Sequence, residues 1–254
     1  MVLAEQVIAE LRKLHSRRYP LYERILNHAF STHKPAFADD KFSKRYEELA
    51  VDGEWFANSL VANACLEGYG SQQIWKFSNL LDNDHYADKV RAHAMDESRH
   101  SSMFVSALRL TFPGVLDEAD EATREKIAQM QPRFSGQRHP PIEKVPVDER
   151  YFEKESINEL IQVHITETRA LVLQYMVRRA FQLHAPARNM DRLMRISDCL
   201  ISDEARHIDY SAEIFEHYAA RDGNADYFFQ CFEDRLCEFN ALTLEELERE
   251  GLSL

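Results

Sequence analysis

Two five-residue segments with the same pattern, DExRH, constrain what this chain can fold into more than any other feature. They are Asp96-Glu97-Ser98-Arg99-His100 and Asp203-Glu204-Ala205-Arg206-His207. On a helix, positions i and i+3 share a face. Each segment can therefore point one carboxylate and one imidazole into the same cavity. A single Glu-x-x-His arises often by chance in helical sequence, so the information lies in the duplication.

One further glutamate precedes each segment at a distance that suits an antiparallel helical hairpin. These are Glu67 and Glu167. Antiparallel helices bring two residues level when both are equidistant from the turn. The midpoint between Glu67 and the first motif glutamate falls in Leu81-Asp82-Asn83-Asp84, a polar turn that ends in a good N-cap residue. The midpoint of the second pair falls in His184-Ala185-Pro186, where proline suits the first turn of a new helix. Each upstream glutamate is therefore expected opposite its own Glu-x-x-His.

The combined residues match the ligand set of a carboxylate-bridged di-iron or di-manganese site in a four-helix bundle. Carboxylate oxygens and imidazole nitrogens suit iron or manganese, whereas zinc usually needs only four ligands. The alternative is a set of solvated residues on long charged helices. We predict two iron ions (Fe2+/Fe3+), with manganese as the alternative, held by the following residues: Glu67, Glu97, His100, Glu167, Glu204 and His207.

The flanking residues of each motif suit a supporting role around the metals. Asp96 and Asp203 precede the motif glutamates, and Arg99 and Arg206 follow them by two residues. An aspartate can accept a hydrogen bond from the outer N–H of a ligand histidine, and an arginine can pair with that aspartate. The alternative is an ordinary ion pair between positions i and i+3 on a helix surface.

The composition predicts one all-helical domain over residues 1–254. Only 7 of the 254 residues are glycine and 8 are proline, and no segment alternates at period two. Several closely spaced prolines make residues 131–147 irregular. The remaining pattern predicts helices at about these ranges: 3–18, 21–30, 42–80, 84–111, 117–130, 148–183, 187–220 and 225–249.

The charge and the apolar pattern exclude several classes of partner. A net charge of −12 argues against a nucleic-acid surface. There is no apolar run of about 18 residues, so no membrane span is expected. The N-terminus lacks the regions of a signal peptide, and the four scattered cysteines suggest reduced thiols, so we expect a cytoplasmic protein.

The order Glu, DExRH, Glu, DExRH resembles that of the ferritin-like di-iron oxidoreductases over roughly residues 50–215. This superfamily includes ribonucleotide reductase small subunits, bacterial multicomponent monooxygenases, acyl-carrier desaturases and arylamine N-oxygenases. The resemblance implies a ferritin-like four-helix bundle, here with additional N- and C-terminal helices. It also implies that Glu67, Glu97 and His100 hold one side of the site and that the second motif and its upstream glutamate hold the other.

Three departures narrow the choice within this superfamily. The reductase subunits usually place a radical tyrosine where this chain has Phe104. The multicomponent hydroxylases carry a threonine at the position of Leu171, and the desaturases carry one at the position of Ala170. What remains is a small stand-alone oxygenase that is most similar in pattern to the arylamine N-oxygenases.

Those N-oxygenases have one more histidine ligand, at the position that Leu200 takes in this chain. His93 and His164 are alternatives, because each precedes a predicted glutamate ligand by about one helical turn. A histidine on a bundle face is also common as a core residue. The sequence therefore leaves open whether either histidine is a ligand.

The predicted function is that of an O2-activating dinuclear non-heme iron oxygenase. It would oxidise a small organic substrate through a peroxo-di-iron intermediate, by N-oxygenation of an amine or by hydroxylation, with electrons from an external donor. The metal ligands are its only predicted catalytic residues. Iron storage, a ligand-binding metalloprotein without turnover and a metal-free helical bundle are the alternatives. No nucleic acid or membrane partner is expected, and a homodimer is an open alternative.

Overall fold

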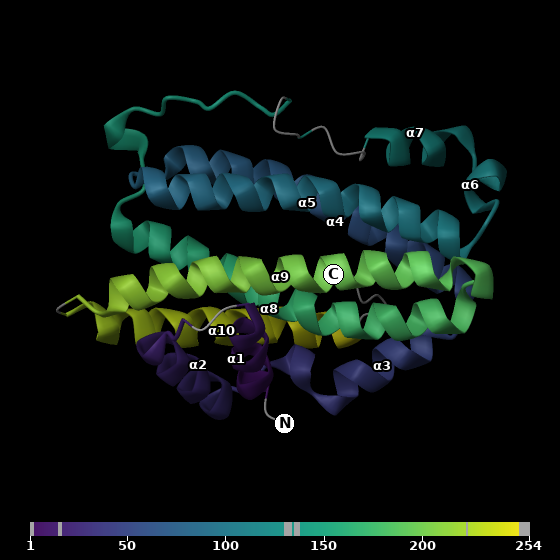
Figure 1. The fold of residues 1–254 in the computed structure, drawn as a ribbon. Helices are drawn as coiled ribbons and strands as arrows, with labels where there is room; N and C mark the ends of the chain where they lie inside the picture. Colours follow the sequence, from purple (N-terminus) through teal and green to yellow (C-terminus); the bar gives the residue numbers. More distant parts are fainter. Residues whose placement is uncertain (1–2, 15–16, 130–133, 135–137, 222, 249–254) are drawn as a thin grey trace. The chain divides into compact units, whose positions relative to one another are not determined.

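The structure is a computed structural model that describes all residues except 1–2, 15–16, 130–133, 135–137, 222 and 249–254. Its described part consists of helices joined by turns and loops, with no strand (Figure 1). One isolated parallel bridge joins Leu81 to Tyr151. The predicted all-helical class is therefore confirmed. Within the described ranges, no helix has an apolar stretch long enough to cross a membrane.

The chain divides into two compact units, and it passes between them more than once. The first unit comprises the described residues of Met1–Tyr46, Glu153–Gln174 and Ile201–Leu252. The second unit comprises Glu47–Phe152 and Tyr175–Leu200. The prediction of one domain over residues 1–254 stays a prediction.

The second unit is built on a hairpin of two long helices, α4 (Gly53–Leu80) and α5 (Asp84–Thr111), which lie side by side (Figure 1). Asn83 caps α5, because its side chain accepts a hydrogen bond from the backbone N–H of Tyr86. The Ser101 hydroxyl donates to the carbonyl oxygen of Ala64 at 2.7 Å and fixes the two helices in register. The predicted helix 84–111 and its hairpin turn are confirmed.

The predicted continuous helix 42–80 is wrong, because the chain breaks at Val51-Asp52. Helix α3 (Asp40–Ala50) ends there and α4 begins at Gly53. The Asp52 carboxylate accepts hydrogen bonds from the backbone N–H groups of Glu54 and Trp55, at 2.8 and 3.3 Å. These bonds satisfy two of the N–H groups that a new helix leaves without a partner, so they stabilise a helix start at this point.

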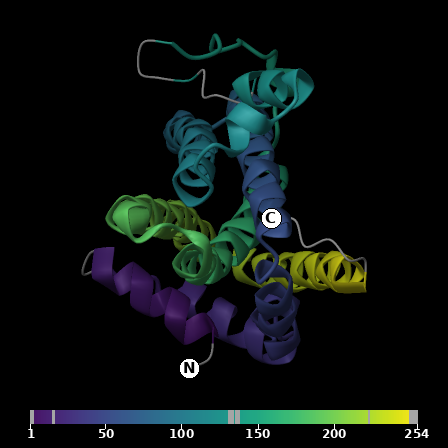
Figure 2. The ribbon, with the colours of Figure 1, turned by 90° about the vertical axis from the view of Figure 1, so that its right-hand side faces the viewer.

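The connection that follows α5 contains two short helices, α6 (Val115–Glu118) and α7 (Glu121–Gln129), where one helix over 117–130 was predicted. Asp120 separates them, because its carboxylate accepts a hydrogen bond from the Thr123 N–H at 2.6 Å. The described residues of 131–146 are irregular, as predicted, and Val147 begins a 3-10 turn. Both views show this connection beside α4 and α5 (Figures 1 and 2). The Trp75 indole N–H holds the connection beside α4 by donating a hydrogen bond to the carbonyl oxygen of Pro141.

Parts of two more long helices complete the second unit: the end of α8 (Glu153–His184) and the start of α9 (Met190–Ala219). Helix α8 follows a single 3-10 turn, Val147–Glu149, and begins later than the predicted 148. The turn between α8 and α9 falls where it was predicted, and a short 3-10 helix, Ala187–Asn189, follows it. The Asn189 side chain donates to the carbonyl oxygen of Leu110, which places the start of α9 level with the end of α5.

The first unit contains the start of α8, the end of α9 and the terminal helices. These are α1 (Leu3–Leu14), α2 (Pro20–Thr32), the 3-10 turn Ala36–Ala38, most of α3, and α10 (Asn224–Glu248). The predicted first helix extended to residue 18, and residues 15–16 of it lie outside the described part. Aromatic rings form much of this unit's core: Tyr22 stacks on Phe215, which packs on Phe228. Figure 2 shows these helices from the side.

Candidate metal centre

The second unit brings four of the candidate ligand residues together, and we call them the second-unit cluster: Glu67, His93, Glu97 and His100. His100 Nδ1 lies 3.5 Å from Glu97 Oε1 and 3.9 Å from Glu67 Oε2. His93 Nε2 lies 3.1 Å from the same oxygen of Glu97. Glu67 is on α4 and the others are on α5. The predicted opposition of Glu67 and the first Glu-x-x-His is therefore present in the structure.

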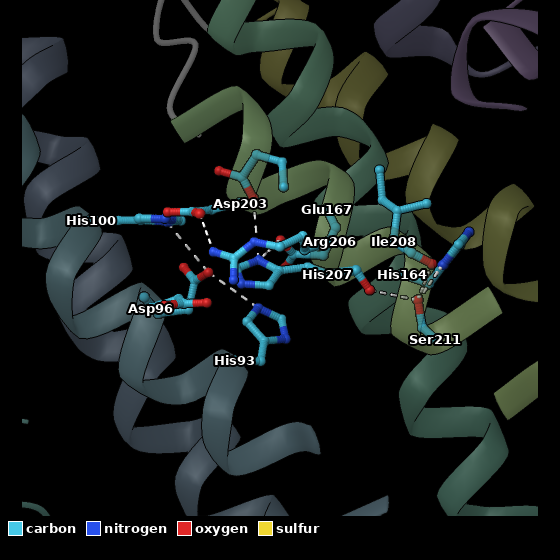
Figure 3. Close-up of polar contacts among 12 residues, drawn as sticks. His93, Asp96, His100, His164, Glu167, Asp203, Arg206, His207, Ile208 and Ser211 are labelled. Atoms are coloured by element: carbon cyan, nitrogen blue, oxygen red, sulfur yellow. Dashed lines mark hydrogen bonds and ion pairs between the residues drawn. The ribbon is translucent and has the colours of Figure 1, made fainter. Parts of the chain in front are cut away.

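The first unit repeats this arrangement in the first-unit cluster: Glu167, Glu204 and His207. His207 Nδ1 lies 3.2 Å from Glu167 Oε2 and 3.5 Å from Glu204 Oε2. Glu167 comes from α8 and the other two from α9, and Figure 3 shows the contact between Glu167 and His207. The second upstream glutamate thus also faces its own Glu-x-x-His.

Three of the four carboxylates in the two clusters are buried, and Glu67 is partly exposed. Glu97, Glu167 and Glu204 are 6%, 5% and 1% exposed. Acidic side chains are rarely buried to this extent unless they are paired or bind a metal, because removing a charge from water is costly. The burial therefore argues against the alternative of solvated residues on a charged surface.

The donor atoms fit a transition metal. Ligand atoms of Glu67 and His100, of His93 and Glu97, and of Glu167 and His207 lie within 4.8 Å of one another, pair by pair. Oxygen and nitrogen donors of these types suit iron or manganese. The glutamates and histidines of these clusters could hold a metal ion. The identity of the metal and the assignment of the six ligands stay predictions.

The aspartate and arginine of each motif pair with one another. Asp96 and Arg99 form an ion pair of 2.9 Å between Oδ1 and Nη2. Asp203 and Arg206 also form an ion pair, which Figure 3 shows. Asp203 is 3% exposed, whereas about half of the Arg206 side chain is exposed. The buried carboxylate and exposed guanidinium fit the predicted supporting role. The hydrogen bond from a ligand histidine to each aspartate stays a prediction.

Both ring nitrogens of His164 have partners in the first unit. Nε2 lies 2.9 Å from the Tyr22 hydroxyl oxygen, and Nδ1 lies 2.7 Å from Ser211 Oγ (Figure 3). The ring is fully buried, and this burial lowers the pKa of His164 to about 3. The contacts favour a core histidine. His93, which contacts a predicted ligand glutamate, is the better candidate for a seventh ligand.

The sequence did not reveal the partners of His164. Tyr22 is 142 residues from it and lies on a terminal helix with no motif. The only local signal is the spacing of Ser211, one helical turn after His207, which places both residues on one face of α9.

The chain matches no protein-family model, and it matches neither a curated protein nor a solved structure. Its chemistry is therefore inferred from its own residues.

Proposed function

We propose that the two clusters together bind two iron ions and that the protein is an O2-activating oxygenase of a small organic substrate. In this proposal the long helices α4, α5, α8 and α9 form the four-helix bundle of the ferritin-like di-iron proteins. The observation that carries the proposal is the duplication: each of two largely buried clusters joins a Glu-x-x-His to a glutamate from the preceding long helix.

The donor set supports iron in a redox role. Four glutamates would neutralise two divalent ions, and a donor set with only two or three histidines would leave room for O2 and substrate. When bound, a pair of Fe(II) ions supplies the electrons that reduce O2 and the oxidising equivalents that reach the substrate. The protein's own residues hold the ions, bury them from water and fix the orientation of each histidine.

Both N-oxygenation of an amine and C–H hydroxylation fit this donor set. His93 favours N-oxygenation, because it would add an imidazole to the donor set and make that set more like the one of the arylamine N-oxygenases. Repeated turnover at such a site would need electrons from outside it. We therefore propose an external electron donor, unless the substrate itself supplies electrons.

Anaerobic loading with Fe(II), followed by mixing with O2, tests this proposal. We expect about two irons per chain, consumption of O2 and a transient visible absorption band. The decay of that band should be faster with one class of candidate substrate. Protein with much more iron per chain would indicate storage. Protein purified from iron-supplied cells without bound metal would contradict the proposal and favour a metal-free bundle.

A further inference from the structure

Two polar side chains in the core of the second unit have no hydrogen-bond partner among the described residues. They are Asn63, on α4, and Ser197, on α9. Each is 1% exposed. Neither the oxygen nor the nitrogen of the Asn63 amide is satisfied, and the Ser197 hydroxyl is also unsatisfied. A buried polar group without a partner destabilises a fold by more than an ordinary hydrogen bond stabilises it, so such groups require an explanation.

Both residues lie on the helix faces that carry predicted metal ligands. Asn63 precedes Glu67 by four residues, which is one turn of α4, and Ser197 precedes Glu204 by seven residues, which is two turns of α9. The first unit repeats the pattern, because Gln174 follows Glu167 by seven residues, is 1% exposed and has no partner for its amide. Three of the buried polar groups without a partner thus lie at helical spacing from predicted ligands.

The register of the helices places Asn63 and Ser197 near the level of His100. The hydrogen bond from Ser101 to the Ala64 carbonyl oxygen puts Asn63 level with the turn of α5 that carries His100. One groove of the second unit is lined by Met103 of α5 and by residues of α9 on either side of Ser197. Ser197 is therefore level with the next turn of α5, about 5 Å further along the helix.

The side chains one turn from the ligands are apolar at this level. Phe104 follows His100 by four residues and is fully buried, and Leu200 precedes Glu204 by four residues and is also fully buried. Two of the positions one turn from the predicted ligands are thus occupied by buried apolar side chains, whereas Asn63 and Ser197 are buried and polar. A few convergent polar groups in an apolar environment are characteristic of small-molecule sites.

We propose that Asn63 and Ser197 bind the polar group of the substrate beside the metal ligands, and that this group is neutral with both a donor and an acceptor, as in a carboxamide. An amide side chain offers donors and an acceptor, and a hydroxyl offers both. An anion satisfies only the donors and a cation only the acceptors, so a neutral donor–acceptor group leaves the fewest atoms without partners. This inference rests on the proposed function, because it assigns a substrate class to the proposed site.

The test compares Asn63→Leu and Ser197→Ala with the natural chain, in the iron-loaded state. Replacing a partnerless buried group by an apolar one of similar size removes the cost of desolvation. We expect unchanged iron content and a melting temperature that is unchanged or higher by about 2–4 °C. Binding of benzamide, followed by ligand-observed NMR, should weaken at least about tenfold in each variant. Ethylbenzene, which has no donor or acceptor, should bind all three proteins equally.

Ser101→Ala is the matched control for stability, because Ser101 is equally buried but has a hydrogen-bond partner. This control should melt at a lower temperature. A lower melting temperature for Asn63→Leu as well would show that its amide has a structural partner, such as a buried water, and would overturn the inference. Failure of the natural chain to bind benzamide, or equal binding by the variants, would overturn it too. If benzamide binds and the variants weaken its binding as expected, but the protein does not take up iron, only the proposed function is contradicted.

Discussion

The Tyr22 hydroxyl and the His164 ring meet in the core of the first unit, with 2.9 Å between the oxygen and Nε2. The other contacts fix the tautomer. Ser211 Oγ is placed to donate to the carbonyl oxygens of His207 and Ile208, so it accepts from His164 Nδ1–H. His164 Nε2 then accepts from the Tyr22 hydroxyl. Burial also raises the pKa of Tyr22 well above its usual value, so the phenol keeps its proton.

The first prediction is a pH dependence of stability that originates at His164. Its pKa is about 3 in the folded protein, whereas the ordinary value is 6.5. Between these values the unfolded chain binds a proton that the folded chain does not, so the free energy of unfolding decreases as the pH falls below about 6.5. The decrease should be at most about 1.4 kcal/mol per pH unit. Urea unfolding of metal-free protein at several pH values measures it.

His164→Gln is the control for this pH dependence, because glutamine can hydrogen bond but does not titrate in this range. Other buried groups contribute equally to both proteins and cancel in the difference. The natural chain should therefore lose stability relative to His164→Gln as the pH falls from 6.5 to 4.5. Parallel profiles for the two proteins would show that the folded protein accommodates a charged His164.

The second prediction concerns the predicted ligands themselves. Glu97→Ala and His207→Ala should each lower bound iron at least about tenfold while the chain stays helical, because each removes a direct donor. Elemental analysis and circular dichroism measure the two properties. Without metal, the variant Glu97→Ala should unfold at the same or a higher urea concentration, since buried carboxylates that lie close together repel one another. Full iron content in either variant would show that the ligand assignment is wrong.

The third prediction is the absence of a persistent tyrosyl radical after O2 exposure. Phe104 is fully buried at the position where the reductase subunits usually have a radical tyrosine, and a phenylalanine ring has no hydroxyl to oxidise. Electron paramagnetic resonance of iron-loaded, oxygenated protein should therefore show no stable tyrosyl signal. A stoichiometric signal would move the protein towards the reductase class, and its loss in Tyr22→Phe would identify the residue that carries it.

The sequence predicted those features that depend on local spacing. The bounds of α5 and the opposition of each upstream glutamate to its Glu-x-x-His follow from helical periodicity and the two turns. The break before α4 was missed, because the long helical pattern outweighed Asp52, whose capping role depends on its conformation in the fold. The Tyr22–His164 contact was beyond sequence reasoning, because packing between distant segments produces it. The helices alone establish neither a four-helix bundle nor the identity of the metal.

The last prediction separates the two candidate histidines by paired substitutions. His93→Ala should weaken the binding of one iron by about 10- to 100-fold, or shorten the lifetime of the transient absorption band, because His93 Nε2 lies 3.1 Å from a predicted ligand oxygen of Glu97. His164→Ala should keep its iron but lose roughly 3 kcal/mol of stability, because it creates a cavity and leaves the Tyr22 hydroxyl without its partner. Iron titration and urea unfolding of both variants measure these effects.

The reverse pattern, with iron lost only from His164→Ala, would require the ring to leave Tyr22 and Ser211 when metal binds. Full iron affinity in both variants would leave six protein ligands, and hydroxylation would then become the better-supported reaction.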